Sequence, residues 1–323
     1  MRIYFKKVMA VVSIAGVLVI SGCQKVGSVN PIEIAALNGP TGIGMVKLMS
    51  DQENVSKKYN INLYESPDEI VGKVVSGEVD IACVPSNMGA VLYNKTDGEV
   101  ELLGTNTLGV LYIVENGDSI QTVEDLRGKT ILSSGKDSTP EFVLNHILEA
   151  NGIDPATDIN IEFMGSHADI ASKVVTEEGS SALLPQPFVT TVLANNEQMK
   201  AALDVNEIWK NAENMDLPMG IMIGKKVFAM EESKQLKNFL KAYEQSVKFV
   251  VNNPKQAAAL TVAYGIILDV EIAKKAIPAC NIVYKDAEGS REMLTKFYEI
   301  LGAANPKSIG GKVPDEAFYA STK

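Results

Sequence analysis

The sequence predicts an α/β protein of two domains, and three observations support this. A chain of 323 residues with 46% apolar residues is long enough to bury two hydrophobic cores. Short β-branched and apolar runs are followed repeatedly by a polar turn and then by residues with helical apolar spacing. Two further strand-like runs, 110–114 and 216–223, are placed to carry the chain from a first domain into a second and back.

The N-terminal residues have the features of an export signal. Three basic residues precede the apolar run 8–20, which is shorter than the roughly 20 residues of a membrane-spanning helix. The run ends in Ile20-Ser21-Gly22-Cys23, which resembles a bacterial lipobox. We therefore expect a signal peptide over 1–22, lipidation of Cys23 and a short polar tether to residue 30. An ordinary leader with a chance cysteine is the alternative. A lipid anchor would hold the folded part at the extracytoplasmic face of the cell membrane.

Charge and cysteine content exclude several classes of function. The net charge of -10 argues against nucleic acid or an anionic membrane surface as a partner, because both select for basic patches. Cys83 lies inside a predicted buried strand, and Cys280 is nearly two hundred residues away. A disulfide would be compatible with an exported protein, but two buried thiols are the favoured interpretation. Neither cysteine has a neighbouring ligand at metal-site spacing, so no metal is expected.

Polar turns follow three strand-like runs of the first domain. Ser86 and Asn87 follow the run 79–84, where Pro85 ends the strand and the two polar residues stand at a predicted helix N-cap. Two similar turns hold Asn38, Pro40 and Thr41 after 32–36, and Thr105 and Asn106 after 100–103. Open α/β sheets bind ligands at such carboxyl ends of strands.

The glycines near Thr41 do not form a nucleotide-binding motif. A phosphate-binding loop counted from Gly39 would need lysine where Met45 stands, and a dinucleotide fingerprint counted from Gly42 would need glycine at Lys47. A tight turn remains, in which Thr41 is either a cap or a ligand contact.

The second domain repeats the pattern. Ser138 and Thr139 follow the run 130–132, and Pro140 as first helical residue predicts Thr139 as the N-cap. The run 181–184 continues into Pro185-Gln186-Pro187, a weak echo of the turn at Pro85. These hydroxyl and amide groups, with the free N–H groups of the helices, predict a second polar wall.

Seven motifs in one order resemble a known family over nearly the whole mature chain. They are the lipobox, Asn38-Gly39-Pro40-Thr41, Gly77-Glu78-Val79-Asp80-Ile81-Ala82, Asp125-Leu126-Arg127-Gly128-Lys129, Ser138-Thr139-Pro140-Glu141, Leu184-Pro185-Gln186-Pro187-Phe188 and Pro314-Asp315-Glu316-Ala317-Phe318-Tyr319. Together they resemble the nitrate/sulfonate/taurine-type substrate-binding proteins of ABC importers, a group that also includes binders of thiamine-precursor pyrimidines.

The resemblance implies a type II periplasmic-binding-protein-like fold with a two-strand hinge and a ligand cleft between two lobes. Lobe 1 would contain 31–112 and 218–323, and lobe 2 would contain 113–217. Gln186 departs from the family, in which glutamate often stands between the prolines, and this makes a cationic ligand group less expected at that point.

The function predicted from these residues is capture without chemistry. The lobes would close on a small solute, and the ABC permease and ATPase subunits would act on the closed, monomeric protein, with no cofactor. Because no arginine falls in a predicted cleft turn, we expect a small organic solute that is partly polar and partly apolar. The predicted ligand-binding residues are Asn38, Pro40, Thr41, Ser86, Asn87, Thr105, Asn106, Ser138, Thr139, Gln186, Pro187 and Met219.

Two other classes of function stay open at this point. One is an enzyme on the same fold, acting on a menaquinone or thiamine precursor. The sequence provides poorly for it, because His146 has interior helical spacing, His167 follows a capping serine, and no nucleophile elbow or zinc motif is present. The other is a lipoprotein adhesin or receptor-like module, which would not need polar turns that converge.

Overall fold

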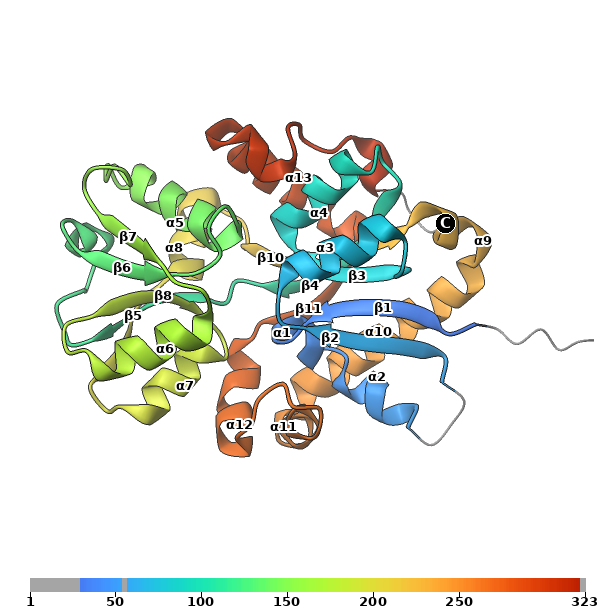
Figure 1. Ribbon diagram of the computed structural model, residues 1–323, viewed down its shortest axis with the longest axis horizontal. Helices are drawn as coiled ribbons and strands as arrows, with labels where there is room; N and C mark the ends of the chain where they lie inside the picture. Colours follow the sequence, from blue (N-terminus) through green and yellow to red (C-terminus); the bar gives the residue numbers. More distant parts are fainter. Residues whose placement is uncertain (1–29, 54–56, 320–323) are drawn as a thin grey trace, which may run out of the picture. The chain divides into compact units, whose positions relative to one another are not determined.

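The short β-branched and apolar runs of the sequence form strands, as predicted. In the computed structural model, which describes residues 30–53 and 57–319, these strands form two mixed sheets (Figure 1). The described residues from Pro31 onward belong to one compact unit. Helices pack on both faces of each sheet, so the fold class is α/β, as the sequence predicts.

The larger sheet has six strands in the order β11-β4-β10-β3-β1-β2. They are β1 (Ile32–Leu37), β2 (Tyr59–Tyr64), β3 (Ile81–Pro85), β4 (Val100–Leu108), β10 (Pro218–Lys225) and β11 (Ile282–Asp286). β1 pairs in parallel with β2 and β3, whereas β10 runs antiparallel to both of its neighbours, β3 and β4. The carboxyl ends of β1, β2 and β3 therefore lie at one edge, which we call the carboxyl edge of the six-stranded sheet.

The smaller sheet has five strands in the order β7-β6-β8-β5-β9. They are β5 (Leu111–Asn116), β6 (Thr130–Ser133), β7 (Asn160–Phe163), β8 (Ser181–Pro185) and β9 (Met199–Asp204). β6 is parallel to β7 and β8, and β5 is antiparallel to β8 and β9. The carboxyl ends of β6, β7 and β8 form the carboxyl edge of the five-stranded sheet.

The helices lie between and around these strands. They are α1 (Pro40–Ile43), α2 (Val46–Asp51), α3 (Pro67–Ser76), α4 (Ser86–Lys95), α5 (Thr139–Ala150), α6 (His167–Thr176), α7 (Phe188–Asn195), α8 (Val205–Glu213), α9 (Lys226–Glu231), α10 (Ser233–Asn252), α11 (Pro254–Ala263), α12 (Val270–Ala279) and α13 (Ala287–Ala304), with short 3-10 turns η1 (Val123–Leu126), η2 (Pro306–Ile309) and η3 (Glu316–Tyr319).

Three apolar clusters make up the core. One joins α3, α4 and α13 on the six-stranded sheet to α5 and α8 on the five-stranded sheet, and Trp209 and Phe297 meet in it with ring centroids 5.8 Å apart. A second packs α2, α10, α11 and α12 on the other face of the six-stranded sheet. A third packs α6 and α7 on the other face of the five-stranded sheet. Each sheet is thus buried on both faces, which explains its near-continuous apolar strands.

The chain passes between the sheets twice. β4 ends at Leu108 in the six-stranded sheet and β5 begins at Leu111 in the five-stranded sheet; the return path runs from α8 into β10. These are the two places where the sequence predicts crossings. The exact division into lobes, 31–112 with 218–323 and 113–217, stays a prediction.

Helix starts follow the predicted capping chemistry in some places. Ser66 caps α3 through the Asp68 N–H with Pro67 in the first turn, and Thr122 and Asp125 form the predicted capping box. Ser166 caps α6 through the Asp169 N–H.

Three local predictions are wrong. Thr105 and Asn106 do not form a turn, because β4 continues through them while it pairs with β10 and β11. Ser86 is the first residue of α4, and its side chain makes no capping bond. The N-cap of α5 is Ser138, one residue before the predicted Thr139.

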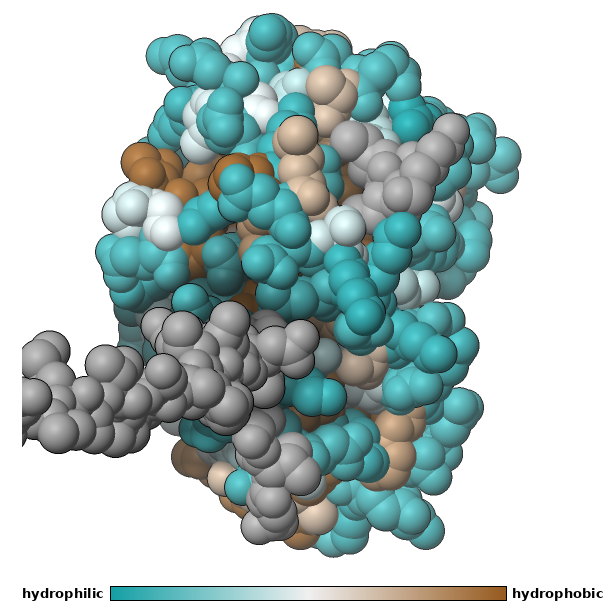
Figure 2. Space-filling model, turned by 90° about the vertical axis from the view of Figure 1, so that its right-hand side faces the viewer, coloured by the Kyte–Doolittle hydropathy of each residue, from teal (hydrophilic) through white to brown (hydrophobic). Residues whose placement is uncertain are grey.

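Charged and polar side chains dominate the surface on the α9 side of the molecule (Figure 2). Most large apolar residues are buried, and the exposed ones come from several separate elements: Val75, Leu193, Val227, Met230, Val251, Leu268 and Val270. Separate apolar residues of this kind are ordinary on a protein surface.

Candidate ligand-binding site

The six-stranded carboxyl edge places two predicted residues deep in the protein. Ser86 and Asn87 follow β3 directly and are 0% and 1% exposed. The hydroxyl of Tyr298 donates to the main-chain oxygen of Ser86 at 2.9 Å, and Asn87 Nδ2 donates to the main-chain oxygen of Ser308 at 3.1 Å. The C-terminal part of the chain thus fixes the backbone and the amide of this turn from behind.

Several polar atoms near this edge are buried without a hydrogen-bond partner in the protein. They belong to Ser86 (Oγ), Thr105 (Oγ1), Asn106 (Nδ2) and Asn38 (Oδ1), all predicted ligand residues. A buried hydroxyl or amide without a partner costs about 1–3 kcal/mol, so such groups call for a physical explanation. A polar molecule that enters and completes their hydrogen bonds would provide one.

Thr41, Asn106 and Gly220 pack closely where β1, β4 and β10 end or bend. A Cβ atom at Gly220 would lie 2.6 Å from Asn106 Oδ1 and 3.2 Å from Thr41 Cγ2. The Thr41 hydroxyl donates to the Leu37 oxygen at 2.9 Å, so it closes its own turn. Asn106 Oδ1 accepts from the Thr107 hydroxyl at 3.1 Å, and Asn106 Nδ2 stays unpaired. These contacts favour a supporting role for Thr41, whereas Asn106 still has an amide N–H group without a partner.

The remaining predicted residues of the six-stranded half are partly exposed. Asn38 Nδ2 donates to Glu65 Oε1 at 2.6 Å, which ties the turn after β1 to the end of β2. Pro40 begins α1, and Met219 lies in β10 beside Gly220, packed against the core.

One hydrogen bond joins the two halves at the carboxyl edges. Thr139 Oγ1, at the start of α5, donates to Asn87 Oδ1 at 2.8 Å, and both side chains are buried. The contact joins residues of the two sheets that the sequence predicts on opposite walls. Ser138, which precedes Thr139, donates instead to the main-chain oxygen of Gly135.

Gln186 is buried and its oxygen is already paired. Gln186 Oε1 accepts from the Thr190 N–H at 3.2 Å and from the Thr190 hydroxyl at 2.8 Å, so it satisfies the first turn of α7. Pro187, which follows a cis peptide bond, is the N-cap of α7. Gln186 therefore offers only its amide N–H groups to a ligand.

Two residues that the predicted site lacks, Ser134 and His167, meet at the five-stranded carboxyl edge. Ser134 Oγ lies 2.8 Å from His167 Nδ1, and the ring of Phe188 lies 5.4 Å from the imidazole centroid. Burial lowers the pKa of His167 from its ordinary value to about 4, so the ring is neutral at neutral pH. The signal that could have found it is its position, because it is the first helical residue after a parallel strand.

His146 has a different environment. Its Nε2 lies 2.7 Å from Glu213 Oε1, and its ring stacks at 5.1 Å on the buried Trp209. The Lys296 ammonium, on α13 of the six-stranded half, lies 3.3 Å from the other oxygen of Glu213. The predicted structural role of His146 agrees with these contacts.

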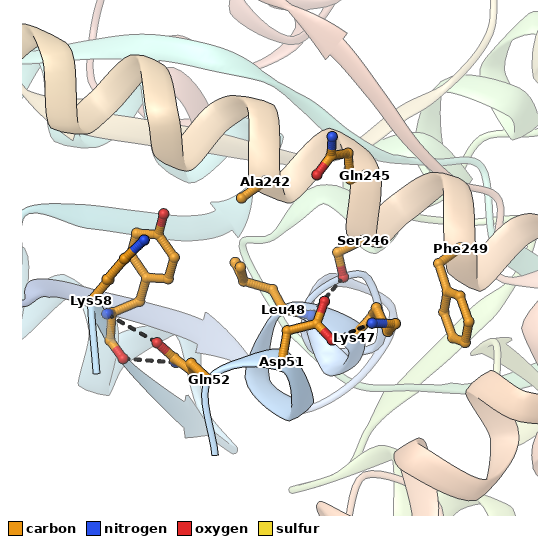
Figure 3. Close-up of a pocket in the computed structure, with 10 residues that line it drawn as sticks. Lys47, Leu48, Asp51, Gln52, Lys58, Ala242, Gln245, Ser246 and Phe249 are labelled. Atoms are coloured by element: carbon orange, nitrogen blue, oxygen red, sulfur yellow. Dashed lines mark hydrogen bonds and ion pairs between the residues drawn. The ribbon is translucent and has the colours of Figure 1, made fainter. Parts of the chain in front are cut away.

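A cavity of about 380 Å³ lies away from these edges, between α2, the start of β2 and α10 (Figure 3). Its polar groups bond largely to one another, since Lys47 pairs with Asp51 and the Gln52 side chain bonds the main chain of Tyr59. None of the predicted ligand-binding residues lines it.

The described part of the chain contains neither a group of metal ligands nor a membrane-spanning helix. No group of three or more His, Cys, Asp or Glu among residues 30–53 and 57–319 is arranged to hold a metal ion. Within the same ranges, no helix is both long and apolar enough to cross a membrane.

Cys83 and Cys280 are free and buried, and burial raises the pKa of each thiol to about 12, so the buried-thiol interpretation is confirmed. Cys23 lies outside the described residues.

The fold defines the class of protein. Two mixed α/β sheets that exchange strands through two crossings form the fold of periplasmic binding proteins. The family model described as "ABC transporter, phosphonate, periplasmic substrate-binding protein" matches residues 49–267, and the chain belongs to this family. It is a family of periplasmic substrate-binding proteins of ABC transporters, which bind a small solute outside the cytoplasm and work with a permease and an ATPase. The predicted relationship to ABC substrate-binding proteins is confirmed.

Solved structures show the same fold at low sequence identity. A protein described as an ABC transporter from Parabacteroides distasonis is 22% identical, with a TM-score of 0.77 over 91% of this chain and 99% of that one. The aliphatic sulphonate binding protein of Escherichia coli is 14% identical, with a TM-score of 0.70 over 88% and 90%. The ligand-binding component of an ABC-type import system from Staphylococcus aureus, solved with zinc bound, is 14% identical, with a TM-score of 0.66 over 91% and 100%. No curated protein sequence matches the chain.

Proposed function

We propose that the protein captures a small organic solute between the carboxyl edges of its two sheets and delivers it to an ABC permease. The observation that carries this proposal is the hydrogen bond between Asn87 and Thr139, which brings a residue from each edge within 2.8 Å. A solute that contacts both edges would favour the state in which they are close, by its differential affinity for that state. The permease would then recognise that state.

The chemistry of the edges favours an uncharged or weakly charged solute with polar and apolar parts. The predicted ligand residues are hydroxyl, amide, proline and methionine side chains. Both described arginines are engaged elsewhere, Arg127 with Glu124 and Asp158, and Arg291 with Glu288 and Glu316. A micromolar affinity needs about 8 kcal/mol, which several neutral hydrogen bonds and apolar contact can supply.

We also propose that the protein is a lipoprotein. A signal peptide over 1–22 and lipidation of Cys23 would anchor it at the extracytoplasmic face, where a monomer on a short tether could reach its permease. Mass spectrometry of membrane-extracted protein should find the mature chain starting at an acylated Cys23. A mature chain that starts elsewhere, or a Cys23 without acyl groups, would contradict this.

The solute can be identified from the protein itself. Small molecules that copurify with residues 24–323 would be released by denaturation and identified by mass spectrometry, followed by thermal-shift screening. We expect a neutral, ring-containing or similarly amphipathic compound that raises the melting temperature. Nanomolar binding of nitrate or taurine without binding of any heterocycle would contradict the solute class. A protein that retains no small molecule and binds none of the screened compounds would contradict capture altogether.

A further inference from the structure

His167 lies where three turns of the five-stranded sheet meet. β7, β6 and β8 are neighbouring parallel strands, so their carboxyl ends lie side by side. His167 begins the helix after β7, Ser134 follows β6, and Phe188 begins the helix after β8. The imidazole contacts both of the other residues: Nδ1 lies 2.8 Å and Nε2 3.3 Å from Ser134 Oγ, and the Phe188 centroid lies 5.4 Å away.

Residues at this edge also contact the six-stranded half. Thr139 follows Ser134 in the same connection between β6 and α5, and it hydrogen-bonds Asn87. α7, which begins with Phe188, packs against α12 of the six-stranded half. His167 and Phe188 therefore belong to the set of turns that the proposed function places around the solute.

The position of the His167 imidazole is not explained by a role in capping α6. Ser166 caps α6, and its hydroxyl also donates to Asp169 Oδ2 at 2.8 Å. The Asp169 carboxylate is thus engaged with the cap. A protonated imidazole would also be unfavourable at the positive end of the α6 dipole, and burial keeps the ring neutral. A neutral ring has one donor and one acceptor nitrogen, and with Nδ1 paired to Ser134 the other nitrogen, Nε2, is left to exchange one hydrogen bond with a solute.

We propose that His167, oriented by Ser134, and the face of Phe188 together determine the specificity of the site for a flat, uncharged ring that bears hydrogen-bonding nitrogen or oxygen atoms. This inference rests on the proposed function and deepens it. The solute ring would lie against Phe188 and exchange a hydrogen bond with the imidazole. The unpaired Ser86 hydroxyl on the opposite edge would bond another polar atom of the same solute.

Titration of variants tests this assignment. The probes are nicotinamide, cytosine and thymine as neutral rings, with taurine and nitrate as anions, added to residues 24–323 and followed by calorimetry. For any ring that binds the wild type, we expect His167→Gln to weaken binding about tenfold, through loss of one hydrogen bond. Phe188→Leu should weaken it about threefold. His146→Gln, which changes the other histidine of the same half, should stay within about twofold, the scatter expected for a residue away from the solute.

A spectroscopic measurement separates contact from a merely structural role. Ring ¹⁵N chemical shifts of His167 should change on addition of the bound ring, while those of His146 should not. Unchanged His167 shifts, or wild-type affinity in both His167→Gln and Phe188→Leu, would overturn the assignment. If Ser86→Ala then still weakens binding, capture stands and only the role of His167 fails. Binding of taurine or nitrate without any ring also overturns the assignment, and binding of no probe with no copurified molecule overturns the proposed function on which it rests.

Discussion

The two sheets share one strand order but treat the polar groups at their carboxyl edges differently. β2-β1-β3-β10-β4 in one sheet corresponds to β7-β6-β8-β5-β9 in the other, and in each the fourth strand arrives from the opposite half. At the six-stranded edge the hydroxyls of Ser86 and Thr105 are buried without partners. At the five-stranded edge Ser134 is paired with His167 and Gln186 with Thr190. Backbone topology alone therefore does not determine whether the polar side chains at an edge have hydrogen-bond partners.

The C-terminal segment accounts for much of this difference. α13, η2 and η3 pack behind α4, where Tyr298 and Ser308 bond the turn after β3 and Asn94 Nδ2 bonds the Ile309 oxygen. The protein thereby uses the main chain of Ser86 and leaves its hydroxyl free. Because the protein itself offers that hydroxyl no partner, we expect a bound solute to add more hydrogen bonds at the six-stranded edge than at the five-stranded edge, where Ser134 and Gln186 are already paired.

The pH dependence of stability should show the strongest contrast between the edges. The folded-state pKa of His167 is lowered to about 4, below the value of about 6.5 expected in the unfolded chain. Between these values the unfolded chain binds a proton that the folded protein does not, so the free energy of unfolding falls as the pH is lowered. The loss should be on the order of 3 kcal/mol between pH 7 and pH 4. Urea denaturation at several pH values measures it.

Comparison of variants isolates this effect from other titrating groups. His167→Gln should show a fall that is smaller than that of the wild type by about 3 kcal/mol, and His146→Gln should retain the wild-type fall. An equal fall in the wild type and His167→Gln would show that the edge histidine is not held neutral.

Two serine-to-alanine substitutions should change the free energy of unfolding by amounts that differ in sign or in size. Ser134→Ala leaves a His167 nitrogen without its partner and should lower the free energy of unfolding by about 1–2 kcal/mol. Ser86→Ala removes a hydroxyl that has no partner, so it should leave stability unchanged or raise it slightly. Chemical denaturation of the solute-free proteins measures both. Equal destabilisation would contradict the contrast between a paired and an unpaired edge.

The hydrogen bond between Asn87 and Thr139, which joins the two edges, should make the smallest contribution to stability of those considered. A double-mutant cycle with Asn87→Ala and Thr139→Val should give a coupling free energy of about 0.5–1.5 kcal/mol, the value of one neutral hydrogen bond. The cycle cancels the loss of the Asn87 bond to Ser308, which occurs in both arms. Thermal denaturation measures the coupling, and a value of zero would show that the contact adds nothing to the folded state.

Local patterns predicted most of the elements that depend on local chemistry. The strand at β3, its end at Pro85, the Ser66 cap and the Thr122–Asp125 capping box follow from β propensity, a missing N–H donor and side-chain bonds within a few residues. β9 and α8 were not predicted, because the run 199–204 has no clear alternation and becomes a strand by pairing with β5. β4 likewise extends through Thr105 because β10 and β11 pair with it there.

The candidate site was predictable in part for the same reason. Turns after parallel strands can be found one by one in the sequence, and Ser86, Asn87 and Thr139 are predicted in this way. Which turns meet depends on strand order, and the order β7-β6-β8 brings Ser134, His167 and Phe188 together from three separate segments. In the structure, the side-chain oxygen atoms of Thr41 and Gln186 form hydrogen bonds within their own turns. The residue types alone could not reveal this.

The interior position of β10 has a consequence for how the chain folds as it is made. The five-stranded sheet uses one uninterrupted segment, from Leu111 to Asp204, and can assemble once that segment has emerged. β10 must be inserted between β3 and β4, which are synthesised long before it, so the six-stranded sheet has to wait with two strands unjoined. Pairing over such sequence separation is slow, and the waiting strand edges would be the point at which the nascent chain most needs protection from aggregation.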